Sequence, residues 1–352
     1  MRKLLILLGS LGVLAAWPEA ASPQAAKRQP AVDTSRADTK NRFVGTWKLV
    51  AIERFGPNGE RLPPPAPPAF GSSNPTGFIV YDAAGYMGVS MMQSGRQKFA
   101  GALPTADEAK AALLSYTSYC GTFSVNDADG MVTHHIQISL NPNNTGTDQR
   151  SSFQFSGNRL VLKPSRAVDR IQAQLTWERM PDVTVLTPMH RQLIGVWKQV
   201  SGERRTFDGK VVRTEPPRVG LLIFSAAGHM AVHTGDPGRK KYAAADPTPE
   251  EARQALNTYG NYFGPYEINE RESYEVTRQV GVINPAEVGQ LAVRRLEFVG
   301  SDRVFLKPMP PAILDGNNRV IRNPQPPATL DGRLVQGYIL WEHVTPPVGS
   351  TP

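Results

Sequence analysis

The pattern of apolar and polar residues predicts short β-strands along most of the chain. Apolar runs at residues 78–81 and 221–224 are rich in β-forming residues, and each ends at a turn signal that contains a glycine. Residues 132–140 alternate in character, and His134 lies on the side that is otherwise apolar. Short strands at this spacing favour a β-sandwich or a β-barrel.

One short α-helix is predicted between the strands of each half. Thr105 and Glu108 have the spacing of a capping box, and so do Thr248 and Glu251. An apolar stripe at helical spacing follows each box. Its members are Ala109, Ala112, Leu113 and Tyr116 in the first half, and Ala252, Ala255, Leu256 and Tyr259 in the second.

The two halves repeat one another. The tetrapeptide Gly-Thr-Trp-Lys that contains Trp47 recurs as Gly-Val-Trp-Lys around Trp197. Residues 77–125 align with 220–268 without a gap, and 20 of these 49 positions are identical. The repeat is about 145 residues long, which is the size of a domain and not of a solenoid unit. We therefore predict a duplicated domain.

The repeat and the composition divide the chain into segments. We expect a signal peptide (1–22), a disordered leader (23–42), a first domain (43–180), a linker (181–192), a second domain (193–345) and a tail (346–352).

The first residues have the pattern of a secretory signal. Arg2 and Lys3 precede an apolar run at residues 4–16, and small residues follow at 20–22. The apolar run is shorter than the ~20 residues that a membrane-spanning helix needs. We expect a periplasmic or secreted protein without a stable membrane span after signal removal. An uncleaved anchor is the alternative.

Composition narrows the function further. The net charge is +8, but the basic residues are interspersed with acidic ones, so we expect no nucleic-acid partner. The single cysteine, Cys120, aligns with Phe263, which indicates a buried apolar position. No metal-ligand spacing, phosphate-binding loop or nucleophile motif is present, so we expect no metal and no cofactor.

Several residues of the first half, most of them repeated in the second, together resemble the pattern of a known family. They are Gly45, Trp47 and Lys48 in the opening strand, Gly85 and Tyr86, Gly95 and Arg96, Tyr116, Tyr119, Gly121, His134, Asn141 and Pro142, Gly146, and the closing Trp177 and Glu178. The pattern is similar to that of the bacterial and fungal lipocalin-like domain family, over residues 43–180 and 193–345. The resemblance implies an all-β fold of two lipocalin-like antiparallel barrels, each with one short α-helix. Trp47 and Trp197 would plug the closed ends.

In such a barrel His134 is a polar group in an apolar cup, where it can orient a ligand or transfer a proton. It aligns with Thr277 in the second half. The other candidate ligand-binding residues are Tyr116, Tyr119, Tyr259 and Tyr262 after the helices, and Arg96 and Arg239, each after a glycine. The alternatives are that His134 is a hydrogen-bonded interior residue, that the tyrosines pack the helices onto the barrels and that the arginines form salt bridges.

Three functions are compatible with these residues. The first is an exported protein that binds a small hydrophobic or amphipathic molecule in a barrel cup. The second is a cyclase, isomerase or hydratase for a lipid-like or polyketide-like substrate, with His134, Tyr119 and Arg150 as its catalytic residues. The third is a structural envelope protein with filled barrels. The absence of a catalytic motif favours binding over catalysis, and no protein partner is indicated.

Overall fold

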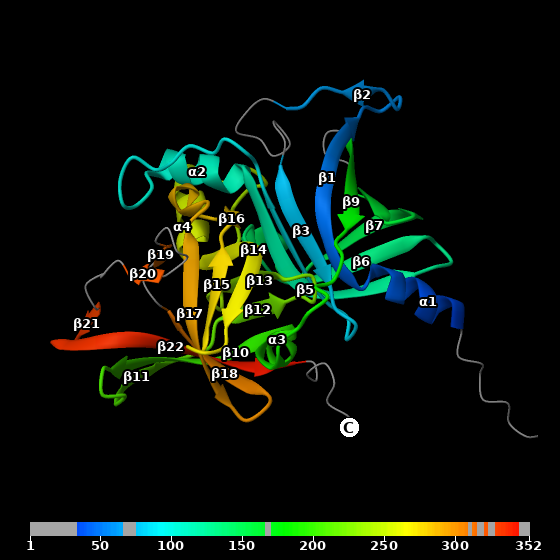
Figure 1. The fold of residues 1–352 in the computed structure, drawn as a ribbon. Coiled ribbons are helices and arrows are strands. Elements are labelled where there is room, and N and C mark those ends of the chain that lie inside the picture. Colours follow the sequence, from blue (N-terminus) through cyan, green and yellow to red (C-terminus); the bar gives the residue numbers. More distant parts are fainter. Residues whose placement is uncertain are drawn as a thin grey trace, which may run out of the picture. The chain divides into compact units, whose positions relative to one another are not determined.

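The computed structural model describes residues 34–65, 75–165, 170–308, 312–314, 320–322 and 328–344 (Figure 1). The expected signal peptide and the expected tail lie outside the described residues. None of the helices in the described ranges has the length and apolar character that a bilayer crossing requires.

The first half forms a closed antiparallel barrel of eight strands. Each strand pairs with the next along the sheet, and β1 also pairs with β9, which closes the barrel. A short strand, β2 (Arg61–Leu62), extends β1 as a hairpin beyond the barrel. The eight barrel strands are β1 (Gly45–Phe55), β3 (Thr76–Tyr81), β4 (Tyr86–Met92), β5 (Tyr116–Asn126), β6 (Met131–Ser139), β7 (Asp148–Ser156), β8 (Arg159–Pro164) and β9 (Gln172–Arg179).

The second half repeats this barrel and closes it by pairing β10 with β22. Its barrel strands are β10 (Gly195–Thr206), β12 (Val219–Phe224), β13 (His229–Gly235), β14 (Tyr259–Asn269), β15 (Tyr274–Arg278), β17 (Leu291–Val299), β18 (Arg303–Pro308) and β22 (Arg333–His343). The shorter strands are β11 (Val211–Glu215) beside β10, β16 (Gly281–Val282) beside β14, β21 (Ala328–Leu330) beside β22, and the separate pair β19 (Ala312–Leu314) and β20 (Val320–Arg322). The predicted fold class is confirmed.

The two predicted helices are α2 (Ala106–Leu114) and α4 (Pro249–Asn257). Both begin with the predicted capping box, in which the threonine side chain accepts from the glutamate N–H and the glutamate accepts from the threonine N–H. Each helix lies between the fourth and fifth strands of its half. A single 3₁₀ turn, η1 (Pro142–Asn144) or η2 (Pro285–Glu287), occurs later in each half.

Two further helices precede the barrels, and the sequence did not predict them. They are α1 (Thr34–Phe43) and α3 (Pro188–Leu193). Residues 34–42 therefore form a helix where a disordered leader was expected. The last residue of each helix is held by a tryptophan of the following strand. The Trp47 indole N–H donates to the Phe43 carbonyl at 2.7 Å, and Trp197 donates to Leu193 at 2.8 Å.

These contacts lie at the closed end of each barrel. Phe43 is fully buried, and its ring meets Tyr81 edge-on at a centroid distance of 5.2 Å. The Arg179 guanidinium lies over the Trp47 ring at 4.4 Å, a cation–π contact. In the second barrel His343 takes the position of Arg179 against the tryptophan.

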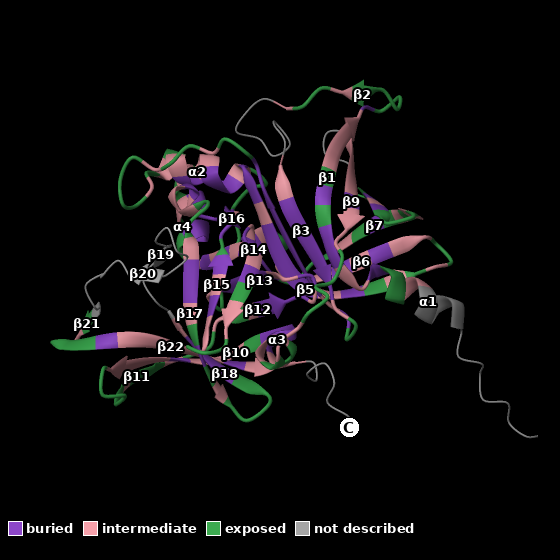
Figure 2. Cartoon of the chain, viewed as in Figure 1, coloured by how far each residue is buried: buried purple, intermediate pink, exposed green. Residues whose placement is uncertain are grey.

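The barrels share a hydrophobic cluster on their outer faces. It combines residues of the first half (Phe78, Val80, Cys120, Ile138) with residues of the second (Leu221, Ile223, Ala231, Phe263) and with the buried faces of α2 and α4. Cys120 is buried, as predicted. Gly88 allows the close approach, because a Cβ atom there would lie 2.8 Å from the His233 ring. In Figure 2 buried residues run along the strands of both halves.

Two arginines join the barrels reciprocally. Arg96 donates to the carbonyls of Val282 and Ile283, both at 2.7 Å. Arg239 donates to Ser139 and to Leu140, the latter at 2.8 Å. Ser139 and Leu140 align with Val282 and Ile283. The same surface of each barrel therefore contacts the other barrel, as in a two-fold symmetric dimer, but within one chain.

We predict that Arg96→Met destabilises the protein by about 2–4 kcal/mol, because buried carbonyls lose a charged donor. Arg239→Met should have a similar effect, because its contacts repeat those of Arg96. Urea unfolding measures both. Arg253→Ala is the control, because its ion pair with Glu250 is exposed and such pairs contribute little. Equal stability of Arg96→Met and the control contradicts the interface described above.

Candidate functional site: two barrel cups

The first barrel contains a cavity of about 740 Å³. Alternate residues of a strand point to the same face, so one set from each strand lines the lumen. Most of the wall is apolar. The apolar lining residues include Ile52, Ile79, Val89, Met91, Ile136, Leu162, Leu175 and Trp177. We call this cavity cup 1.

A chain of three hydrogen-bonded side chains lies in the lumen of cup 1. His134 Nε2 is 2.8 Å from the Tyr81 hydroxyl, and His134 Nδ1 is 2.9 Å from the Tyr119 hydroxyl. All three side chains are buried. Burial, with a smaller contribution from His135, lowers the pKa of His134 to about 3, so the imidazole is neutral near pH 7. We call these residues the Tyr–His–Tyr chain.

The strand register places this chain at the floor of cup 1. Tyr119 pairs with Val89, Val89 with Ile79, and Ile79 with Trp47 of the closed end. Arg54 also lines the cavity but lies further along β1, about 20 Å from Trp47 by strand rise. Arg54 donates to the Pro63 carbonyl at 3.1 Å and makes no ion pair within the described part of the chain. The positive charge is therefore at the mouth.

Arg150 does not join the Tyr–His–Tyr chain. Although it borders the cavity, it pairs with Thr133, whereas His134 pairs with Gln149. Neighbouring residues of a strand point to opposite faces, so Arg150 and His134 are on opposite sides of the sheet. The structure does not bring together the three residues suggested for catalysis.

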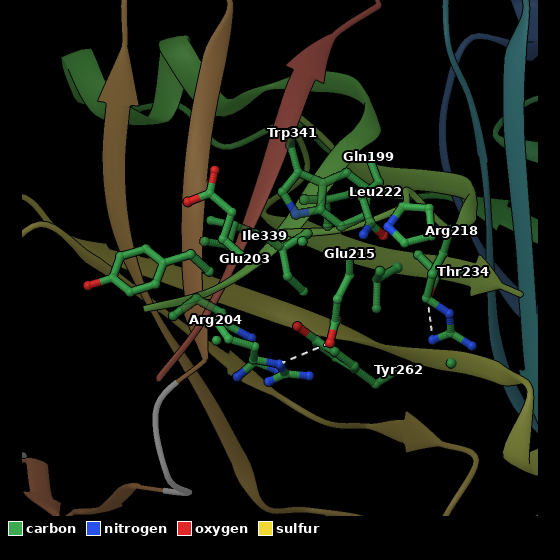
Figure 3. Close-up of a pocket in the computed structure, with 18 of the residues that line it drawn as sticks. Gln199, Glu203, Arg204, Glu215, Arg218, Leu222, Thr234, Tyr262, Ile339 and Trp341 are labelled. Carbon is green, nitrogen blue, oxygen red and sulfur yellow. Dashed lines mark hydrogen bonds and ion pairs between the residues drawn. The ribbon is translucent and has the colours of Figure 1, made fainter. Parts of the chain in front are cut away.

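The second barrel contains a smaller cavity of about 360 Å³, which we call cup 2 (Figure 3). Its wall is more polar. The polar lining residues include Gln199, Glu203, Arg204, Glu215, Arg218, Thr234, Asn261, Tyr262 and Arg294. Arg204 aligns with Arg54, but its charge is paired, because its Nε lies 3.3 Å from a Glu215 oxygen.

A carboxyl group is buried in the wall of the second barrel. Glu275 is fully buried and accepts a hydrogen bond of 2.8 Å from the Thr277 hydroxyl, while its other oxygen has no partner among the described residues. Arg294 is its register partner on β17. Burial raises the pKa of Glu275 to about 7, and Arg294 opposes that shift. The first barrel has Val132 in place of Glu275.

The candidate residues fall into two groups. Tyr119 and His134 line cup 1, Tyr262 lines cup 2, and Thr277 is buried against Glu275. Four candidates lie between the barrels and line neither cup. They are Tyr116, which donates to Asn261, Tyr259, which contacts Ser118, and the interface arginines Arg96 and Arg239.

Sequence reasoning did not single out Tyr81, Arg54, Glu275 or Arg294. Two of them had a detectable signal. Arg54 and its aligned partner Arg204 stand at equal spacing after the two repeated tryptophans. Glu275 is an acidic residue at a position where the alternating pattern predicts an interior side chain.

The closed barrels and their cups define a lipocalin-like protein, and comparison with known families agrees. The model of the lipocalin-like domain family matches residues 44–185 and 194–321, so the chain belongs to this family. The fold is generally one that binds small ligands. Comparison with curated proteins finds no match.

Some similar solved structures match most of this chain and others match less than half of it. A protein of unknown function from Nostoc punctiforme is 10% identical, with 88% of this chain and 99% of that chain covered and a TM-score of 0.23. A mutant of the fluorescent protein UnaG is 16% identical over 40% of this chain and 96% of that chain, with a TM-score of 0.22. A redesigned β-barrel is 11% identical over 42% of this chain and 96% of that chain, also with a TM-score of 0.22.

The buried carboxyl predicts an unusual pH dependence of stability. A carboxyl whose pKa is raised from 4.5 to about 7 favours the folded state at low pH and loses that contribution as the pH rises through 7. Between pH 5 and pH 8 the free energy of unfolding should therefore fall in the unsubstituted protein. In Glu275→Gln this fall should be smaller by on the order of 2 kcal/mol. Urea unfolding at both pH values measures it. Glu267→Gln, an exposed substitution on β14, is the control and should show the same change in stability between the two pH values as the unsubstituted protein. An identical pH dependence in all three proteins contradicts the burial argument.

Proposed function

We propose that this protein binds a small hydrophobic or amphipathic molecule in cup 1. The observation that carries the proposal is the cavity of about 740 Å³, with an apolar wall and the Tyr–His–Tyr chain at its floor. Ligand pockets in proteins are generally ~300–1,000 Å³ and combine an apolar lining with a few placed polar groups. Burial of apolar ligand surface would supply the binding free energy.

The alternatives have less support. A structural protein with filled barrels requires interiors occupied by side chains, whereas both barrels contain a cavity. An enzyme using His134, Tyr119 and Arg150 requires the three to meet, and Arg150 is on the other face of the sheet. His134 is also held between two hydroxyls and stays neutral, which makes it a weak base for substrate.

Filling cup 1 should abolish binding, and filling cup 2 should not. Val89 lines cup 1, and the aligned Val232 lines cup 2, so the two positions form a matched pair. We predict that Val89→Trp lowers the affinity for 1-anilinonaphthalene-8-sulfonate at least about tenfold, because the indole occupies the ligand volume. Val232→Trp should leave the affinity unchanged. Fluorescence titration measures both variants after thermal unfolding has shown that they fold.

Two results contradict this assignment. One is that the folded Val89→Trp protein binds the dye as the unsubstituted protein does. The other is that Val232→Trp alone abolishes binding, which moves the site to cup 2. Native mass spectrometry of protein purified from cell extract adds a second readout, with a bound mass expected in the unsubstituted protein and not in Val89→Trp.

We also propose that the protein is exported to the periplasm or secreted. The support is the basic and apolar pattern of residues 1–22. Fused to a reporter that is active only outside the cytoplasm, residues 1–22 should confer activity. Leu8→Arg should abolish it, because a charge interrupts the apolar run. Equal activity with and without the substitution contradicts export by this segment.

A further inference from the structure

We infer that cup 1 selects ligands whose buried end carries an uncharged oxygen acceptor, such as a ketone, aldehyde or ester carbonyl, and that the Tyr119 hydroxyl donates to it. This inference rests on the proposed function and specifies its ligand.

The Tyr–His–Tyr chain has one more O–H or N–H donor than its internal hydrogen bonds require. A neutral imidazole has one N–H and one acceptor nitrogen. Its N–H donates to one tyrosine oxygen, and the other tyrosine donates its O–H to the acceptor nitrogen. The tyrosine that receives the imidazole N–H therefore keeps its own O–H proton. Neither Tyr81 nor Tyr119 has another hydrogen-bond partner in the part of the chain that the structure describes.

The position of the two tyrosines decides which one keeps the proton. Tyr81 is 1% exposed and does not line the cavity, whereas Tyr119 is among the lining residues. An unpaired donor in a sealed interior costs ~1–3 kcal/mol. The favoured arrangement has Tyr81 donating to Nε2 and Nδ1–H donating to Tyr119. The Tyr119 O–H, which has no other partner in the described part of the chain, is then available to an acceptor in the cavity that Tyr119 lines.

The charge distribution decides what kind of acceptor fits. His134 is neutral, and the other side chains of the floor row, Ile79 and Val89, are apolar. A carboxylate at the floor would lose its hydration without gaining a counter-ion, which is costly. The inward-facing cation, Arg54, is at the mouth. The floor therefore favours an uncharged acceptor.

Cup 2 provides an internal control, because it keeps one member of the chain only. Tyr262 aligns with Tyr119, but Phe224 stands in place of Tyr81 and Thr277 in place of His134. Arg294 lies over the Tyr262 ring at 5.6 Å, a cation–π contact that has no counterpart at Tyr119 among the contacts of the described residues. Removing the Tyr262 hydroxyl therefore tests for effects of a lost phenol group outside cup 1.

The test uses two fluorescent probes that differ at one group, 6-propionyl-2-(dimethylamino)naphthalene and its carbonyl-free 6-propyl analogue. Tyr119→Phe should weaken binding of the ketone about fivefold, the loss of one hydrogen bond, and leave the analogue unchanged. Emission of the bound ketone should shift to the blue in Tyr119→Phe, because its carbonyl loses a donor. Tyr262→Phe should change neither probe.

The inference is overturned if Tyr119→Phe, shown to fold by thermal unfolding, affects both probes equally or neither. If Val89→Trp still blocks the binding of both probes in that case, the inference fails but the proposed function stands. If neither probe binds the unsubstituted protein in cup 1, the proposed function and this inference fail together.

Discussion

The hydrogen bond from the first-strand tryptophan to the end of the preceding helix determines which end of each barrel is closed. Trp47 holds the Phe43 carbonyl, and Trp197 holds the Leu193 carbonyl. The helix end and the indole fill the lumen at that end. An eight-stranded barrel has room for little more than side chains or one small ligand, so the remaining space becomes a cup that opens at the opposite end. The floor of each cup is therefore formed by the row of residues next to the tryptophan.

The duplication separates what the scaffold needs from what each cup can hold. The capped helices, the indole hydrogen bonds and the interface arginines occur in both halves, and the atoms that they bond lie at equivalent places in the two barrels. The barrel interiors do not repeat. His134 lines cup 1 and Val132 is buried in the core of the first barrel, while Thr277 and Glu275 occupy the aligned places in the second barrel. The wall of cup 1 is mostly apolar, its floor carries the neutral Tyr–His–Tyr chain, and the Arg54 charge lies at its mouth. Cup 2 is smaller and more polar, and the charged groups along its wall disfavour an apolar ligand.

Local signals made part of this structure predictable. The capping boxes lie within four residues of sequence, and the alternation around His134 is a property of one strand. Contacts between distant strands carry no such signal, so Tyr81 could not be recognised as a partner of His134. Nor could Arg96 and Arg239 be placed between the barrels, because that depends on how two folded units pack. Helix α1 was missed because a polar segment with Phe43 at its end has weak helical periodicity.

The central claim is that a ligand enters cup 1 and not cup 2. Methyl NMR of isoleucine-labelled protein tests it most directly, because Ile79 and Ile136 line cup 1 and Ile339 lines cup 2. On titration with a naphthalene ketone, the methyl resonances of Ile79 and Ile136 should shift in a saturable way while that of Ile339 stays in place. Saturable shifts confined to Ile339, or no saturable shift at any of the three, would contradict the claim.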